Sequence, residues 1–269
     1  MTTSLARPVS RETLLLWVMH RFARAFEDHA ILKGGMALRL WSSPRATNDI
    51  DYVLVPFESK SEVAAQIRAV LTELPGADVQ VTLHSTMVRA EVRMDGAAIQ
   101  IEASVASECP SEPMATGDFA RALGAPSQIV RVMTPSVALA HKLAAWNERR
   151  LLRDLYDSYF LSARVGASPD RDTLTARLQH VRSRLPQLRR VRAMSIERFY
   201  KALQDAAVAL TDDEVAQSLA PLLPLQELAG LATRMRAALV GLVDRTIDLS
   251  QISLTLAGVD EGRMDRVAR

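Results

Sequence analysis

The sequence predicts an α/β (α+β) protein, with a mixed β-sheet and flanking helices in residues 1–133 and a helical domain in residues 134–269. The 269 residues are 48% hydrophobic, which is enough for a core in one large or two modest domains. Glycine and proline are few for this length, and the many Ala, Leu and Arg residues favour helices over an all-β sandwich. Strand patterns end near residue 133, and helical patterns follow.

The first part alternates between helical and strand patterns. Ser10 is the expected N-cap of a helix that extends to about Asp28. A strand is predicted at Ile50–Val55, before Pro56, and the tight Asp95-Gly96 turn predicts a hairpin. The other expected elements are strands at Ala30–Leu32, Asp78–His84, Met87–Met94, Ala98–Ser104 and Gln128–Val132, helices at Met36–Trp41 and Ser61–Glu73, and a loop with one helical turn at Ala106–Pro126.

The second part begins at Thr134-Pro135, where a capping hydroxyl precedes a proline at the first helical position. This predicts a long helix that ends at about Arg164. Thr211 and Glu214 form an expected capping box. Further helices are expected at Arg171–Leu185, Ser195–Leu210, Asp212–Ala220 and from Leu225 to about Asp248, with a polar tail from Asp260.

Composition excludes several classes of protein. Cys109 is the one cysteine, which excludes an internal disulfide framework and a multi-cysteine zinc site and agrees with a reducing compartment. No apolar run reaches the roughly 18 residues of a membrane span. We therefore expect a cytoplasmic protein without a membrane partner.

Positive charge is concentrated in one stretch. The formal net charge is only +2, but residues 142–201 contain 14 Lys and Arg and 6 Asp and Glu. Such an excess indicates either a polyanion-binding surface or ordinary solvated helix faces, and composition alone leaves both readings open.

A glycine pair followed by two aspartates carries the predicted chemistry. Alternate residues of a strand face the same way, so Asp49 and Asp51 should point together while Ile50 enters the core. Two neighbouring carboxylates repel each other unless a cation lies between them, and hard oxygen ligands suit Mg²⁺ or Mn²⁺ shared with a nucleoside triphosphate. Gly34 and Gly35 lack Cβ atoms, so their backbone N–H groups can approach phosphate oxygens closely.

A third carboxylate is available in a later strand. Glu102 should lie beside Asp51 if the two strands are neighbours, which would complete a metal site of Asp49, Asp51 and Glu102. The alternative is a simple Gly-Gly turn and a surface Asp-x-Asp pair. A haloacid-dehalogenase-type pair is disfavoured because it follows an apolar strand, whereas these aspartates precede one.

These motifs resemble those of known toxins. Leu32-Lys33-Gly34-Gly35-Met36-Ala37-Leu38, Asn48-Asp49-Ile50-Asp51, His141-Lys142-Leu143 and Arg153-Asp154-Leu155-Tyr156-Asp157 resemble the AbiEii/AbiGii family of the nucleotidyltransferase superfamily. The resemblance implies a nucleotidyltransferase-like fold, a metal-bound nucleoside triphosphate and a toxin of a toxin–antitoxin or phage-defence system. Thr47 matches a hydroxyl-bearing position of some relatives.

Helix geometry predicts which residues between Lys142 and Asp157 share one helix face. At about 100° per residue, Arg149, Arg153 and Asp157 fall within about 60° of Lys142, whereas Asp154 lies about 120° away. In a continuous helix Asp157 therefore shares the face of Lys142, and a break near residues 148–152 would change this. We expect Lys142 to neutralise a triphosphate and the two arginines to hold phosphate, with a salt-bridged helix surface as the alternative.

The predicted reaction is attack of an acceptor hydroxyl on the α-phosphorus of a nucleoside triphosphate. The resemblance implies an RNA acceptor, first of all the 3′ end of a tRNA, and a block of translation. Transfer to a protein hydroxyl, such as one of a cognate antitoxin, and a non-catalytic binding module are the alternatives.

Overall fold

The computed structural model describes residues 7–246, which divide into two compact units. Within the described residues, the first unit is 7–138 with Leu222–Pro224, and the second is Leu139–Pro221 with 225–246. The division falls just after residue 138, a few residues beyond the expected boundary. That each unit is an independent domain stays a prediction. The predicted polar tail from Asp260 lies outside the described residues.

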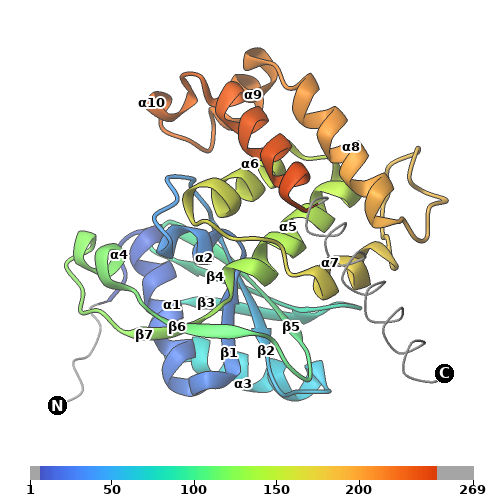
Figure 1. Ribbon diagram of the computed structural model, residues 1–269. Coiled ribbons are helices and arrows are strands. Elements are labelled where there is room, and N and C mark those ends of the chain that lie inside the picture. The colour runs from blue at the N-terminus through green and yellow to red at the C-terminus, as the bar shows by residue number, and fades with distance from the viewer. Residues whose placement is uncertain (1–6, 247–269) are drawn as a thin grey trace, which may run out of the picture. The chain divides into compact units, whose positions relative to one another are not determined.

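A seven-stranded mixed sheet forms the centre of the first unit, in the order β3-β4-β5-β2-β1-β7-β6 (Figure 1). β1–β7 and β2–β5 are parallel pairs, and the other neighbours are antiparallel. The mixed sheet confirms the predicted fold class. The strands are β1 (Ala30–Lys33), β2 (Asp49–Leu54), β3 (Asp78–Leu83), β4 (Val88–Met94), β5 (Ala97–Val105), β6 (Ser111–Ala115) and β7 (Ile129–Met133).

Two helices bury the apolar face of this sheet. α1 (Arg11–Ala25) begins with a capping box between Ser10 and Thr13, and α3 (Lys60–Thr72) packs beside it. Phe22 of α1 stacks on Tyr52 of β2 with ring centroids 4.8 Å apart. Because Ile50, Tyr52 and Leu54 alternate along β2 and all enter this core, the residues between them face the other side.

The predicted hairpin and the predicted loop have different outcomes. β4 and β5 are joined by Asp95 and Gly96, both with positive φ (48° and 82°), as a tight hairpin turn requires. The expected loop at Ala106–Pro126 is wrong in part, because it contains β6; the helical turn expected within it is present as α4 (Gly117–Ala122). Pro113 argued against a strand in the sequence. β6 is an edge strand of the sheet, where proline is tolerated because one side of the strand forms no hydrogen bonds to a neighbouring strand.

The second part of the chain is helical, with breaks that the periodicity did not show. The predicted helix from Pro135 to Arg164 is interrupted at Arg150, whose φ is 54°. The guanidinium carbon of Arg150 lies 4.1 Å from the centroid of the Trp146 ring. The expected last helix is interrupted by Gly230, and its end near Asp248 lies outside the described residues. The elements are α5 (Pro135–Arg149), α6 (Leu152–Tyr159), a π-helical turn η2 (Phe160–Arg164), α7 (Arg171–Leu178), α8 (Ile196–Ala209), α9 (Asp212–Leu219), α10 (Leu225–Leu228) and a helix at 231–246.

Helix α7 ends at Leu178, seven residues before the predicted end at Leu185. The backbone N–H of Met194 donates to the carbonyl of Leu178, so the chain turns back instead of continuing the helix. The capping box of Thr211 and Glu214 is confirmed. No helix within residues 7–246 is both long and apolar enough to cross a bilayer.

His20 gives the folded state a predictable pH dependence. It is buried in α1 with Nε2 3.0 Å from Thr116 Oγ1, and burial, with Arg24 as a smaller cause, lowers its pKa to about 4. Between pH 6.5 and about 4 the unfolded chain binds a proton at His20 that the folded chain rejects, so stability must fall as the pH falls. We expect a loss of roughly 3 kcal/mol across this window in urea unfolding.

Two substitutions isolate this effect. His20→Gln should remove this part of the pH dependence, whereas His180→Gln, at an exposed position, should keep it. An unchanged slope of unfolding free energy against pH in His20→Gln would refute the assignment.

Candidate active site

The two aspartates begin β2 on the face opposite to the α1–α3 core. Asp49 is exposed and Asp51 is half-buried, while Ile50 between them is buried. Since side chains alternate along a strand, both carboxylates lie on one face of the sheet. This arrangement agrees with the pattern expected from the sequence.

The first glycine of the pair lies directly against Asp51. Gly34 follows β1, begins α2 (Gly34–Leu40) and has a φ of +68°. A Cβ atom at this position would lie 2.0 Å from Asp51 Oδ2, far inside van der Waals contact. The register explains the approach, because Lys33 pairs with Asp51 in the β1–β2 ladder. The absence of a side chain at residue 34 therefore makes room for the Asp51 carboxylate.

The second glycine is packed against the segment that leads into β2. A Cβ at Gly35 would lie 2.6 Å from Thr47 Oγ1 and 3.1 Å from Arg45 Nη2. The Thr47 hydroxyl also donates to the carbonyl of Asp49 at 3.3 Å and accepts from its N–H at 3.4 Å. Thr47 thus connects the glycine bend to the start of the aspartate strand.

Glu102 lies beside Asp51 in the sheet. β5 is parallel to β2 and pairs Glu102 with Asp51, which is the adjacency that the sequence left open. However, Glu102 Oε1 accepts from Arg89 Nη2 at 2.8 Å and from Gln100 Nε2 at 2.9 Å. The described part of the chain contains no group of three His, Cys, Asp or Glu side chains placed to hold a metal ion. A third metal ligand at Glu102 stays a prediction.

The chemistry of Asp49 and Asp51 fits a divalent cation shared with a substrate. Both are hard oxygen donors on one face, and neither lies in the hydrophobic core. Mg²⁺ in such proteins takes only one or two carboxylates and completes its shell with water and phosphate oxygens. A two-carboxylate site beside the glycine bend meets this requirement without a third protein ligand.

In the second unit, two ion pairs connect α5 and α6. Lys142 Nζ lies 2.6 Å from Asp157 Oδ2, and Asp157 is only 1% exposed. Asp154 is also 1% exposed and receives two hydrogen bonds from Arg149, at 2.7 and 3.1 Å. In a continuous helix Lys142 and Asp157 would share a face but lie about 22 Å apart along the axis, so this contact depends on the break at Arg150.

The electrostatics of the second pair limits what Arg149 can do. Burial raises the pKa of Asp154, and the positive charges of Arg149 and Lys142 oppose this shift. Arg149 Nε and Nη2 both donate hydrogen bonds to Asp154. In this arrangement these two donors do not bind a phosphate, as the sequence suggested they would. Arg153 is exposed.

Arg45 and Lys33 are candidate site residues that the sequence argument missed. Arg45 is 9% exposed, and its Nη2 lies 3.1 Å from the position that a Cβ atom of residue 35 would take. Lys33 is the ladder partner of Asp51 and therefore shares its side of the sheet. The position of Arg45, four residues before Asp49, was visible, but nothing in the polar segment 42–48 indicated that its side chain is buried.

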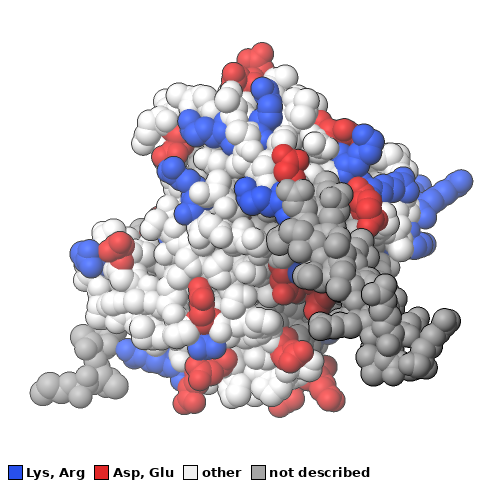
Figure 2. Space-filling view, viewed as in Figure 1, with Lys and Arg blue, Asp and Glu red and all other residues white. Residues whose placement is uncertain are grey.

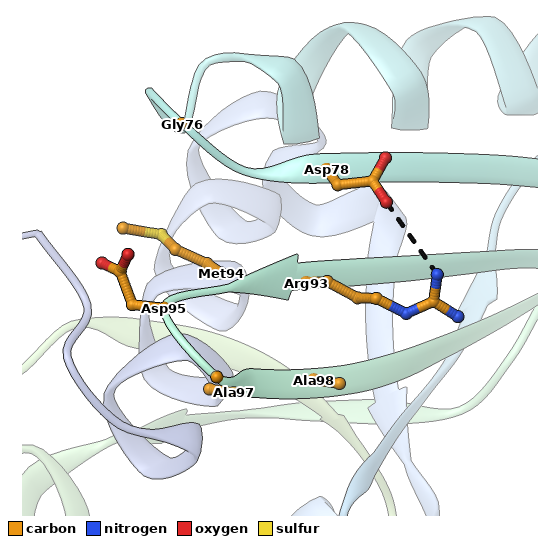
Figure 3. Close-up of a pocket in the computed structure, with 8 residues that line it drawn as sticks. Gly76, Asp78, Arg93, Met94, Asp95, Ala97 and Ala98 are labelled. Atoms are coloured by element: carbon orange, nitrogen blue, oxygen red, sulfur yellow. Dashed lines mark ion pairs between the residues drawn. The ribbon is translucent and has the colours of Figure 1, made fainter.

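Two surface pockets lie away from these residues. The one in Figure 3, of about 320 Å³, is at the β4–β5 turn, where Arg93 and Asp78 are paired at 3.9 Å. The other, of about 450 Å³, is lined by Ser162 and Arg245, among others. Neither of these two pockets includes the glycine bend or the aspartates.

Substitution of Gly34 tests the close approach. In Gly34→Ala the new methyl group must displace the Asp51 carboxylate, and an L-residue at this φ is itself strained by about 1–2 kcal/mol. We expect nucleotide transfer to fall at least about tenfold, measured with a labelled triphosphate.

Gly96→Ala is the matched control, since Gly96 also has a positive φ but has no atom near its Cβ position. Gly96→Ala should introduce similar backbone strain but transfer nucleotide at the wild-type rate. Equal rates for wild type and Gly34→Ala would show that the Asp51 position is not needed.

Two solved structures share the fold of this chain. JHP933 from Helicobacter pylori is similar in structure, with 14% identity over 92% of this chain and 96% of that chain and a TM-score of 0.52. A candidate nucleotidyltransferase from H. pylori has 12% identity, covers 89% and 96% of the two chains, and has a TM-score of 0.50. At these identities the similarity shows a shared fold. The comparison with curated proteins gives no match.

The family model described as nucleotidyl transferase AbiEii toxin, type IV toxin–antitoxin system, matches residues 17–239. This range includes the glycine bend, the aspartate strand and both ion pairs of α5 and α6. It confirms the family resemblance of the sequence motifs. The chain belongs to the AbiEii family of nucleotidyl transferase toxins.

Proposed function

We propose that this protein transfers a nucleotide from a nucleoside triphosphate to the hydroxyl of an RNA acceptor, first of all the 3′ end of a tRNA, and thereby blocks translation. One observation carries the proposal: Asp51 and Asp49 share a face of β2, and Asp51 is packed against the Cβ-free bend at Gly34. The family match supports nucleotidyl transfer, and the resemblance supplies the acceptor.

In the proposed reaction the acceptor hydroxyl gives its proton to water, and its oxygen forms a bond to the α-phosphorus as the bond from that phosphorus to the bridging oxygen breaks. Pyrophosphate leaves. Asp49 and Asp51 would hold Mg²⁺ or Mn²⁺, which supplies charge neutralisation at the phosphates. The backbone of Gly34 and Gly35 approaches the phosphates closely because it carries no side chains.

Cationic side chains complete the proposed nucleotide site. Arg45 lies against Gly35, so its guanidinium is placed to bind a phosphate at the glycine bend. That Lys142 neutralises the β- and γ-phosphates, as the resemblance implies, stays a prediction; within the second unit its ammonium group lies 2.6 Å from Asp157 Oδ2. In this assignment Asp157 is a positioning residue for Lys142, and Asp154 serves the stability of α5 and α6. The family also makes a cognate antitoxin a proposed partner, and a cytoplasmic location stays a prediction.

Incubation of the protein with total RNA and each of four α-labelled triphosphates in turn tests this function. We expect label on RNA, with one triphosphate preferred, and loss of labelling when a chelator removes divalent cations. Digestion of the labelled RNA from its 3′ end should release the label first. Label on protein alone, or on nothing, would refute an RNA acceptor; the first result would favour transfer to a protein hydroxyl and the second a binding module.

A further inference from the structure

Five arginines lie on one loop of the second unit. The segment 182–192, which we call the arginine loop, lies between α7 and α8. Its arginines are all exposed: Arg182, Arg184, Arg189, Arg190 and Arg192. Figure 2 shows positively charged side chains gathered at the right edge of the molecule, where Figure 1 draws this loop.

The charge of the arginine loop is not neutralised locally. No Asp or Glu occurs from Thr173 to Ile196. Within residues 7–246, none of the five guanidinium groups has a carboxylate within salt-bridge distance. Five like charges on eleven residues repel one another, which costs stability and indicates a partner that supplies negative charge.

The loop is nevertheless held in place. Val181, Leu188 and Met194 are buried beneath it, and Val181 N–H donates to the carbonyl of Arg192 at 3.0 Å, which joins the two ends. Glu148 of α5 anchors the first end: its carboxylate accepts from the N–H of Arg182 at 3.3 Å, and its carbonyl accepts from Ser183 Oγ at 2.6 Å. A fixed backbone presents the arginines with less ordering cost on binding than a free tail would.

The composition of the surface favours nucleic acid over an acidic protein. A protein interface has an apolar centre, but the large exposed hydrophobic residues of the described chain lie elsewhere, at Val9, Leu83, Ile129, Leu151, Val208 and Leu225. In the loop region Val181, Leu188 and Met194 are buried, and Leu185 and Val191 are half-buried. Guanidinium groups suit phosphate through paired N–H donors, and backbone contacts to nucleic acid need no apolar centre.

We propose that the arginine loop binds the sugar-phosphate backbone of the RNA acceptor. This inference rests on the proposed function for the identity of the RNA, but the binding itself does not require catalysis. The loop offers no exposed aromatic side chain for base stacking, and its guanidinium groups supply the proposed phosphate contacts. It therefore contributes affinity without sequence preference.

A triple variant measures this contribution. In Arg189→Gln/Arg190→Gln/Arg192→Gln three exposed charges are removed, and the backbone bond from Val181 to Arg192 remains available. The matched control is Arg68→Gln/Arg93→Gln/Arg121→Gln, which removes the same charge from exposed positions of the first unit. Both proteins are compared with wild type by anisotropy of fluorescently labelled, unfractionated tRNA at 50–200 mM salt.

We expect the arginine-loop variant to bind this tRNA at least about tenfold more weakly and to lose about 2 from the magnitude of the slope of log K against log salt. The control should change affinity much less, and both variants should unfold as wild type does. Equal Kd and slope for the two triple variants would overturn the proposal. A competition experiment compares poly-glutamate with a polyphosphate of equal charge as displacers of tRNA from the wild-type protein. Equal displacement by the two polymers would also overturn the proposal, in favour of an acidic protein partner.

The binding assay and the transfer assay distinguish a failure of this inference from a failure of the proposed function. If Asp51→Asn binds tRNA through the arginine loop while wild type labels no RNA, the proposed function fails and the phosphate-binding role stands. If wild type labels RNA and the arginine-loop triple variant has an unchanged KM for it, this inference fails and the proposed function stands.

Discussion

Asp51→Asn should reduce nucleotide transfer by roughly a thousandfold or more. The amide has the shape of the carboxylate, so it still fits against Gly34, but it carries no charge to hold a divalent cation beside the phosphates. The fold should survive, because Asp51 lies outside the hydrophobic core. The measurement is incorporation of α-labelled nucleotide into RNA, with urea unfolding as the check on the fold.

Asp118→Asn provides the matched control for Asp51→Asn. Asp118 is an exposed carboxylate of α4 paired with Arg121, so its neutralisation alters net charge equally at a site without a proposed role. It should transfer nucleotide at the wild-type rate. Undiminished transfer or undiminished growth inhibition by Asp51→Asn would remove the basis of the proposed mechanism.

Arg149→Met should lower the free energy of unfolding by about 3 kcal/mol. Asp154 is buried, and Arg149 supplies the two side-chain hydrogen bonds that compensate its charge. Asp154→Asn should cost less, because the Arg149 side chain is 48% exposed and regains water when its partner becomes neutral. The order of the two losses in urea unfolding at pH 7 is the test.

The pH dependence of Arg149→Met adds a second test. Burial already raises the pKa of Asp154 above 3.8, and removal of Arg149 raises it further. With a raised pKa, the folded state binds the proton more tightly than the unfolded state does, so stability falls as the pH rises through this window. The loss in Arg149→Met should therefore shrink at low pH. Arg153→Met, at an exposed position of the same segment, should lose little, and an equal loss would contradict the assignment.

The sequence predicted local features of the site well. Alternation along β2 placed Asp49 and Asp51 on the face away from Ile50, and the positive φ of Gly34 is the conformation for which glycine is suited. These features depend on neighbours in the chain. The approach of Gly34 to Asp51 depends on the β1–β2 register, which the sequence did not specify.

Features that depend on tertiary pairing were missed. The Arg89 contact that engages Glu102 follows from the β4–β5 register, and the burial of Arg45 follows from packing against Gly35. The break at Arg150 lacks a glycine or proline to mark it, so periodicity continued through it. Arg150 adopts a positive φ while stacking on Trp146, a contact that a one-dimensional pattern does not specify.

The order of strands also determines how much of the chain must be synthesised before the sheet can form. β1 is enclosed by β2 and by β7, and β2 pairs on its other side with β5, so the neighbours of Asp51 come from widely separated parts of the chain. Long-range pairings of this kind form slowly, because the intervening loops must close first. The ribosome must therefore release the chain beyond Met133 before β1 can pair with both of its neighbours.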